Sequence, residues 1–238
     1  MYLKRYRFHS LIHQFYKELI VAKGKGKDLM PLFRCLPLYL KQNRVKSNRL
    51  SLGIPWLTRG AVKFLDNTII SQMRVFEYGS GASTIYFQNR DTIVCSVEHD
   101  KTWYQIVKNK LELNGSNNVD LILSEPVFSP TALRDDILQS NKNDGYKNFD
   151  FSGYSQVVLN FPHKYFDLIL IDGRVRLECL KNSMKMIKKG GLIILDNSDR
   201  YEYKNIIDMH KFKLVFQEYG LVEYDLFFAE TSIFEAIY

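Results

Sequence analysis

The sequence predicts an α/β protein built around a mostly parallel sheet with helices on both faces. Two observations lead to this prediction. From residue 74 onward, short apolar runs alternate with segments of helical length, which is typical of strands buried on both sides. Near the end of the chain, the strand-like runs 213–219 and 224–230 are joined by a short link that contains Gly220, which predicts an antiparallel hairpin at the sheet edge.

The first 70 residues are predicted to form a basic, helical extension. Apolar residues recur at helical spacing over 6–22, which predicts an amphipathic helix with the stripe Phe8, Leu11, Ile12, Phe15, Tyr16 and Leu19. The sequence Lys-Gly-Lys-Gly-Lys at 23–27 predicts a mobile hinge after it. Prolines then interrupt the chain before a second helix near 58–70. We therefore expect an extension over 1–70 and a ligand-binding domain over 71–238.

The second domain supplies the sheet. Strands are predicted at 74–78, 92–98, 119–123, 166–171 and 191–195, with helices at 83–90, 101–113, 153–161 and 175–188. The connection 124–152 is too long for a crossover loop. Because it lies on the carboxyl side of the sheet, where ligands bind in such folds, we expect a lid that faces the substrate, with a solvated loop as the alternative.

The positive charge is confined to the extension. The chain has 33 Lys and Arg against 26 Asp and Glu, a net charge of +7. Residues 1–50 hold 12 of the basic and 2 of the acidic residues, a net of +10, which leaves 21 basic and 24 acidic residues, or −3, for the rest. We expect no binding of nucleic acid by a body of this charge. Helix 6–22 can pack on the body, contact an anionic membrane surface or bind a partner protein.

Cysteine usage and hydropathy predict a protein of the cytoplasm. Cys35, Cys95 and Cys179 are widely spaced and form no CxxC pair, which argues against a disulfide framework or a cysteine zinc site. The N-terminal residues contain charges throughout and lack the apolar core of a secretory signal. No run approaches the roughly 18 apolar residues of a membrane span. Membrane association would therefore be peripheral, at the inner face and through residues 6–22.

The stretch 75–84, Val-Phe-Glu-Tyr-Gly-Ser-Gly-Ala-Ser-Thr, predicts a strand that runs into a glycine turn. A phosphate-binding P-loop would need a Lys after the glycines, and the dinucleotide fingerprint would need a third glycine where Thr84 stands. Glu77, two residues before Gly79, would repel a pyrophosphate and suits a ligand that carries an ammonium group.

These residues resemble motif I of the class I S-adenosylmethionine-dependent methyltransferases, E/D-x-G-x-G, and the resemblance spans about residues 74–238. It implies a Rossmann-like fold with a seven-stranded sheet. It also implies that the methionine end of the cofactor is held by Glu77, Gly79, Ser80, Gly81 and Ser83.

Glu98 is an independent sign of a nucleotide cofactor. It ends the second predicted strand, 21 positions after Glu77. An acidic residue at this point accepts hydrogen bonds from both ribose hydroxyls. His99 can lie over the adenine or act as a base. The alternative for Glu98 is an exposed acidic strand end.

Polar side chains at the ends of the fourth and fifth predicted strands mark an acceptor side. Asp172, Asp196 and Asn197 would lie together there, and such oxygen ligands suit Mg²⁺. The set is similar to the metal site of catechol and caffeoyl-CoA type O-methyltransferases. Those enzymes place a Lys shortly after the first Asp, whereas this chain has Arg174 and Arg176. Alternatively, Asp172 and Asp196 cap helices or bind the acceptor directly.

The predicted function is methyl transfer from S-adenosylmethionine to a hydroxyl or amine of a small molecule or glycan. Asp172 is the candidate base or metal ligand, with Asp196 beside it, and we expect Asp172 also to contact the cofactor. Arg174 is expected either to clamp an acidic group on the acceptor or to pair with an acidic residue of the lid. The stretches 172–179 and 195–201 are similar to bacterial methyltransferases associated with surface polysaccharides, which implies the glycan. Two rivals stay open: an NAD-dependent oxidoreductase, and a non-catalytic scaffold tethered through its basic helix. The sequence predicts no oligomeric state.

Overall fold

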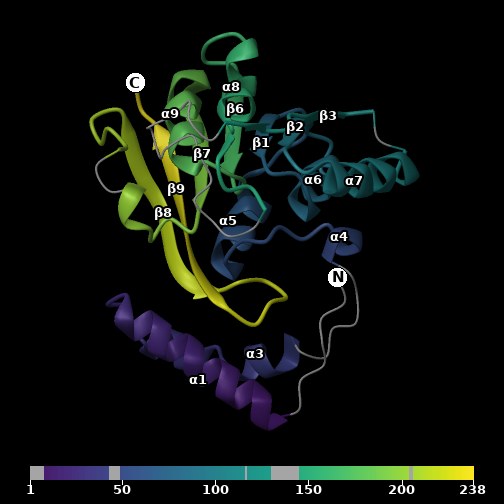
Figure 1. Ribbon diagram of the computed structural model, residues 1–238. Helices are drawn as coiled ribbons and strands as arrows, with labels where there is room; N and C mark the ends of the chain where they lie inside the picture. The colour runs from purple at the N-terminus through teal and green to yellow at the C-terminus, as the bar shows by residue number, and fades with distance from the viewer. Residues whose placement is uncertain (1–7, 43–48, 116, 130–144, 204–205) are drawn as a thin grey trace.

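The computed structural model describes residues 8–42, 49–115, 117–129, 145–203 and 206–238. Its centre is a seven-stranded sheet (Figure 1). In spatial order the strands are β3 (Val119–Leu123), β2 (Ile93–Glu98), β1 (Arg74–Tyr78), β6 (Phe166–Ile171), β7 (Ile187–Asp196), β9 (Phe228–Ala236) and β8 (Phe212–Leu221). β9 is antiparallel to β7 and β8, and the other pairs are parallel. The predicted fold class and its antiparallel hairpin are confirmed. The bounds of the hairpin were wrong, because Gly220 lies within β8 and the second strand is Phe228–Ala236 instead of 224–230.

Each face of the sheet is covered by its own set of helices. The helices of the body are α5 (Arg59–Thr68), α6 (Ala82–Gln88), α7 (Lys101–Leu113), α8 (Ser152–Gln156), the 3-10 turns η1 (Val157–Asn160) and η2 (Tyr201–Tyr203), and α9 (Arg176–Met186). Successive side chains of a strand point to opposite faces. Phe76 and Tyr78 therefore join the core beneath α8 and α9, whereas Val75 joins the core beneath α5 and α6. Both cores run the width of the sheet and hold its carboxyl edge in place.

Two predicted helix ends were wrong. The predicted helix 153–161 is α8 followed by the 3-10 turn η1. The predicted helix 175–188 ends at Met186, because β7 begins at Ile187 and not at 191. Ile187 pairs with Phe166, and the register shifts before the next pair. The residues at 188–191, Lys-Lys-Gly-Gly, interrupt the apolar pattern, so the first residues of this long strand cannot be recognised from the sequence.

The long connection after β3 contains a short antiparallel pair, β4 (Val127–Phe128) with β5 (Phe149–Asp150). Residues 130–144, which the predicted lid includes, lie outside the described residues. The described end of the connection returns to the carboxyl edge of the sheet, where the Tyr146 hydroxyl donates to Asp100 Oδ2 at 3.1 Å.

The N-terminal residues form a small lobe at the end of the β8–β9 hairpin (Figure 1). The lobe consists of α1 (Phe8–Gly24), α2 (Met30–Arg34) and α3 (Leu36–Gln42). The predicted amphipathic helix is confirmed as α1, since Leu11, Phe15 and Leu19 are buried against α3 and the hairpin. Ile12 and Tyr16 belong to the same predicted stripe but are exposed.

Two further helices connect the lobe to the body. α4 (Arg49–Leu52) packs Leu50 against α6 and α7. α5 places Ala61 and Leu65 in the core under β1, so it covers the sheet although it lies within the first 70 residues. The domain division at residue 70 stays a prediction. None of the helices in the described ranges is long and apolar enough to cross a membrane.

The hinge predicted at 23–27 is instead an ordered helix end. Gly26 has φ +68°, the amide of Lys27 donates to Ala22 O at 3.0 Å, and the amide of Gly26 donates to Lys23 O at 2.9 Å. This is the Schellman arrangement that commonly ends helices. Lys25 Nζ lies 2.6 Å from Asp199 Oδ2, and Lys27 forms an ion pair with Glu230. The turn thereby joins the lobe to the carboxyl edge of the sheet beside β7.

Candidate cofactor and acceptor site

Four acidic side chains gather where parallel strands end. Glu77 is in β1, Glu98 ends β2, Asp172 follows β6 and Asp196 ends β7. β1 lies between β2 and β6, where the strand order reverses, and open α/β sheets bind ligands at this position. The topology brings the predicted cofactor residues and the predicted acceptor residues to one edge.

Glu77 is completely buried beneath the glycine turn. Its Oε2 accepts hydrogen bonds from Thr84 Oγ1 and Ser96 Oγ, each at 2.6 Å. Its Oε1 is buried and forms no hydrogen bond of good geometry in the described part of the chain, although the Ser83 hydroxyl lies close enough to favour the ionised carboxylate. Burial raises the pKa of Glu77 to about 7; the neighbouring Ser and Thr hydroxyls oppose the rise, and Glu98 adds to it. A cationic group at Oε1 would satisfy this oxygen and favour the ionised carboxylate.

Thr84 explains why the third glycine of a dinucleotide fingerprint is missing. Its hydroxyl accepts a hydrogen bond from the amide of Gly81 at 2.8 Å and donates to Glu77. A glycine could do neither. The turn is therefore closed by a side chain that also orients the carboxylate beneath it.

Gly79 and Gly81 are glycines for different reasons. Gly79 has φ +91°, and a Cβ there would lie 2.9 Å from Gly173 Cα, so a side chain would separate the turns that follow β1 and β6. Gly81 has φ 167°, which any residue adopts, and a Cβ there would meet nothing closer than the Trp103 ring at 3.8 Å. The fold does not require glycine at 81, and the space beside it is open to a ligand.

Glu98 is buried and fully hydrogen-bonded, so an exposed strand end is excluded. Oε2 accepts from the amide and the hydroxyl of Ser80, each at 3.0 Å. Oε1 accepts from the amides of His99 at 2.8 Å and Asp100 at 2.9 Å. The Ser80 hydroxyl donates to this carboxylate as a ribose hydroxyl would, and a ribose would have to displace it.

His99 lies in an aromatic cluster next to Glu98. Its ring centroid is 5.0 Å from that of Tyr146, 5.5 Å from Phe151 and 6.0 Å from Tyr154. His99 Nδ1 is 2.9 Å from Glu98 Oε1, although the contact lacks hydrogen-bond geometry. The cluster joins the end of β2 to the end of the long connection, around the His99 that was predicted to lie over the adenine or to act as a base.

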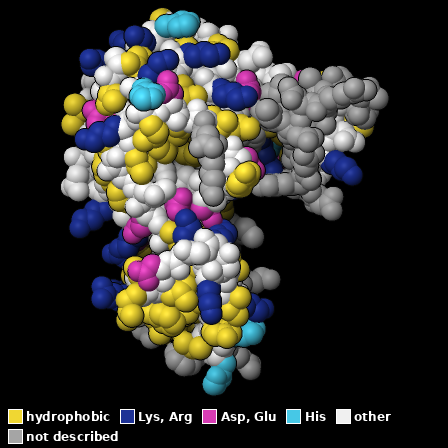
Figure 2. Space-filling view, turned by 90° about the vertical axis from the view of Figure 1, so that its left-hand side faces the viewer, with side chains coloured by type: hydrophobic (Ala, Val, Ile, Leu, Met, Phe, Trp, Pro, Cys, Tyr) yellow, Lys and Arg dark blue, Asp and Glu magenta, His cyan; other side chains and the backbone are white. Residues whose placement is uncertain are grey.

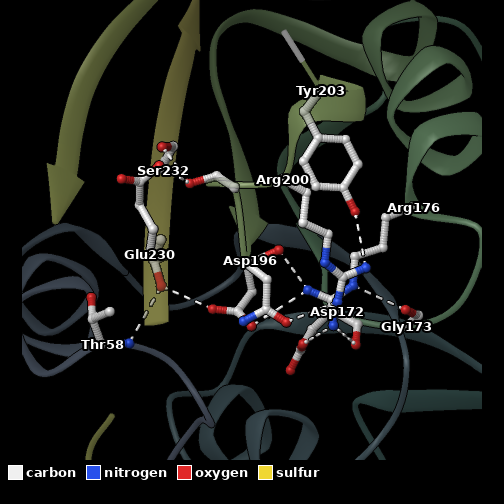
Figure 3. A network of polar contacts seen from close by, with 12 residues as sticks. Thr58, Asp172, Gly173, Arg176, Asp196, Arg200, Tyr203, Glu230 and Ser232 are labelled. Carbon is white, nitrogen blue, oxygen red and sulfur yellow. Dashed lines mark hydrogen bonds and ion pairs between the residues drawn. The ribbon is translucent and has the colours of Figure 1, made fainter. Parts of the chain in front are cut away.

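Arg176 holds the two carboxylates of the acceptor side together (Figure 3). Its Nη2 donates to Asp172 Oδ1 at 2.8 Å, and its Nη1 lies 3.4 Å from Asp196 Oδ2. Its remaining bonds go to the carbonyl oxygens of Asp172, Gly173 and Asp196. The Thr231 hydroxyl donates to the other oxygen of Asp196 at 3.0 Å. The guanidinium is fixed by the ends of two neighbouring strands.

The acidic pair holds protons more readily than exposed carboxylates do. Burial raises the pKa of Asp172 well above its ordinary value; Arg176 opposes the rise, and Asp196 adds to it. Burial likewise raises the pKa of Asp196, again against Arg176. Two carboxyl groups face one guanidinium, so one of them gains from binding a proton.

Comparison with known proteins identifies the fold. Neither protein-family models nor curated protein sequences match this chain. Among solved structures, a methyltransferase-like protein from Silicibacter pomeroyi is 18% identical with a TM-score of 0.52, over 76% of this chain and 87% of that one. An rRNA methylase from Streptococcus thermophilus is 13% identical with a TM-score of 0.51, over 74% and 93%. TrmN from Thermus thermophilus is 12% identical with a TM-score of 0.53, over 87% and 53%. The chain has a methyltransferase fold.

Within this methyltransferase fold, the predicted Mg²⁺ site is not supported. The guanidinium of Arg176 contacts both Asp172 and Asp196, so the positive charge that a cation would supply there is already present. Asn197 Oδ1 accepts a hydrogen bond from Arg200 Nη2 at 3.2 Å. No group of three His, Cys, Asp or Glu side chains suited to a metal ion occurs in the described ranges. A divalent ion would have to displace a fixed positive charge.

Arg174 and Arg176, the two arginines on the predicted acceptor side, have different partners. Arg174 lies over the Tyr146 ring, 5.7 Å from its centroid, and its role as an acceptor clamp stays a prediction. Val175 between them has φ +41°, which a β-branched residue rarely adopts, and strain of this kind clusters at functional sites.

Sequence reasoning did not predict a contact between Trp103 and the glycine turn, because the helical spacing of Trp103 suggests only packing. In the structure its Nε1 donates to Ser80 O at 2.7 Å.

Proposed function

We propose that this protein is an S-adenosylmethionine-dependent methyltransferase. The observation that carries the proposal is the buried, unpartnered Oε1 of Glu77 beneath a glycine turn, beside Glu98 on the next strand. An orphaned buried carboxylate oxygen fits the ammonium group of the cofactor. The open space at Gly81 fits the passage of its chain over the turn.

When bound, the cofactor supplies an electrophilic methyl group on a sulfonium. The chain's own residues then bind and orient. Glu77 and the turn 79–83 would hold the methionine end, and Glu98 would take the ribose hydroxyls in exchange for Ser80. His99 and the aromatic cluster would border the adenine. Alignment of donor and acceptor is the main source of rate in such a displacement.

Asp172 is the proposed proton acceptor. Asp172 follows β6 at the carboxyl edge of the sheet, and its side chain is 19% exposed. Arg176 favours its ionised form, and a carboxylate with a raised pKa is the stronger base. A hydroxyl or amine that attacks the methyl carbon would pass its proton to this carboxylate. Arg176 would hold the carboxylate of Asp172 in place and balance the negative charge of the Asp172–Asp196 pair. A bound cation was predicted to have this role by the similarity to metal-dependent O-methyltransferases.

We propose a small molecule or glycan as acceptor, for a protein of the cytoplasm. The net charge of −3 outside residues 1–50 disfavours extensive contact with phosphates. An RNA acceptor is the second candidate, because a neighbour in fold is named as an rRNA methylase. Transfer of a labelled methyl group to total RNA, compared with transfer to small-molecule and glycan extracts, separates the two candidates.

Calorimetric titration with S-adenosylhomocysteine and with NADH tests the cofactor. We expect micromolar binding of the first and none of the second. Glu98→Gln should weaken binding about tenfold or more, equal to about 1.4 kcal/mol. Because Glu98 also accepts four hydrogen bonds within the protein, the melting temperature of the Glu98→Gln variant must be measured too. Glu112→Gln, at an exposed position, is the matched control.

The same titration decides between the rivals. Binding of NADH alone would replace the methyltransferase with an oxidoreductase, and no binding of either would favour the scaffold. Transfer activity should also persist in EDTA, since Arg176 stands where the cation was predicted. Loss of activity in EDTA, restored by Mg²⁺, would contradict the assignment to Arg176.

A further inference from the structure

We propose that the N-terminal lobe docks on a membrane surface that contains anionic lipid. The proposal begins with α1, which is apolar on two adjacent faces. One face is buried against α3 and the β8–β9 hairpin. The neighbouring face carries Ile12, Tyr16 and Ile20, which are 37%, 60% and 54% exposed. Packing within the lobe accounts only for the first face.

α2 extends the exposed surface. Met30 and Phe33 are 59% and 52% exposed, and the Phe33 ring lies 6.4 Å from that of Phe15 in α1, so the two helices adjoin. The apolar face of the lobe is defined as Ile12, Tyr16, Ile20, Val21, Met30 and Phe33. Figure 2 shows hydrophobic side chains gathered in one area of this lobe, which projects from the body. Large exposed apolar patches with polar rims mark interaction sites.

Basic side chains border the apolar face. Lys17 and Lys23 of α1 and Arg34 of α2 are exposed. Lys23 follows Ile20 by three positions, so it projects on the same side of the helix. Glu18 turns toward the body, where its Oε2 accepts from the amide of Phe228 at 3.1 Å.

One exposed acidic residue also lies near this surface. Asp28 precedes α2, and its Oδ1 accepts from the amide of Met30 at 3.0 Å. Lys17, Lys23 and Arg34 outnumber this one acidic residue, so the border of the apolar face has a net positive charge. The surface combines exposed apolar side chains with a net positive rim.

This charge selects lipid over a second copy of the chain. Self-association through the apolar face would bring together two rims that each carry Lys17, Lys23 and Arg34 against Asp28. Anionic headgroups attract the same residues, while the acyl region accepts Ile20 and Phe33. α1 is 17 residues long and carries Lys17 and Glu18 at its middle, so it would lie in the plane of the interface and not span the bilayer.

The lobe is attached beside the acceptor side of the sheet. Asp199, the partner of Lys25, is three residues beyond Asp196, and Glu230, the partner of Lys27, precedes the Thr231 that binds Asp196. Docking through α1 and α2 would thus bring the acceptor side close to the membrane.

Co-sedimentation of the full chain with vesicles tests the proposal. The probes are phosphatidylcholine vesicles with and without about 30% phosphatidylglycerol. We expect binding to the anionic vesicles only, reversed by about 0.5 M salt. Ile20→Ser with Phe33→Ser should weaken binding at least about tenfold. The control is Leu113→Ser, which removes an 84% exposed side chain on α7 and should change nothing.

A charge-reversal variant keeps the test valid if the apolar variant unfolds. Lys17→Glu with Lys23→Glu should abolish anionic binding without altering the melting temperature. Equal binding to both vesicles, or to neither, would overturn the proposal. A dimer detected by light scattering, and lost in the apolar variant, would also overturn the proposal, because a second copy of the chain would then occupy the face. RNA that displaces the vesicles would overturn it for the same reason.

Discussion

At the scale of single residues, Gly79 and Gly81 provide a test that separates folding from binding. Gly79→Ala places a Cβ 2.9 Å from the backbone of Gly173 at φ +91°, so we expect a loss of about 2 kcal/mol or more in the free energy of unfolding. Gly81→Ala meets nothing within 3.8 Å, so the loss should be about 1 kcal/mol or less, the cost of a poorer helix cap.

The cofactor should respond in the opposite order. Gly81→Ala fills the space proposed for the ligand and should weaken binding of S-adenosylhomocysteine about tenfold or more while the protein stays folded. Urea unfolding and calorimetry on both variants measure the two effects. Unchanged affinity in Gly81→Ala would place the cofactor elsewhere.

The placement of Glu77 and Glu98 was easier to predict than the contacts of Asp172 and Asp196, for a physical reason. Glu77 lies in β1 and Glu98 ends β2, so an apolar run followed by a motif predicts where both lie. The sequence shows Arg176 as one of two arginines after β6. The direction of its side chain, however, depends on the left-handed backbone of Val175 and on carbonyl oxygens at the ends of two strands. No spacing rule encodes that arrangement. The metal site was predicted because oxygen ligands can be read from sequence, whereas a guanidinium between them cannot.

At the scale of elements, the turn after α1 shows why glycine-rich sequence is ambiguous. Two glycines among lysines suggested mobility, yet Gly26 ends the helix and both lysines find buried carboxylates. The partners, Asp199 and Glu230, lie 174 and 203 positions away, so the local sequence carries no sign of them. An apolar run, in contrast, is a local pattern, and all five strands predicted from 74 to 195 were confirmed.

Lys27→Met tests whether this turn fastens the lobe. The side chain of Glu230 is 7% exposed, and among the described residues the change leaves it with its hydrogen bonds to Ser198 and Gln217. We expect a loss of about 1–3 kcal/mol in urea unfolding, since a buried carboxylate loses its cation. Lys211→Met breaks an exposed pair with Asp208 and should cost less than about 0.5 kcal/mol. Equal effects of the two variants would show that the turn is not docked.

At the scale of the whole molecule, stability should fall as the pH rises from about 5 to 8. Burial is the main cause of raised pKa values at Glu18, Glu77, Asp172, Asp196 and Glu223. A carboxyl group with a raised pKa binds its proton more tightly in the folded state than in the unfolded state. Its contribution is complete below the unfolded pKa and is lost as the pH rises through the folded pKa. This is the reverse of the usual acid denaturation by salt-bridged carboxylates.

Glu77 gives this prediction a definite window. Its pKa rises from 4.5 to about 7, so up to about 3 kcal/mol of stability should disappear across that interval. Glu77→Gln cannot ionise and should flatten the dependence of the melting temperature on pH. Because a bound ammonium group favours the ionised carboxylate, S-adenosylhomocysteine should bind more tightly to the wild type at pH 7.5 than at pH 6, a difference of up to about tenfold. The variant should bind weakly at both values. A wild type whose affinity does not change with pH would mean that Glu77 does not face the ammonium group, whatever else the turn binds.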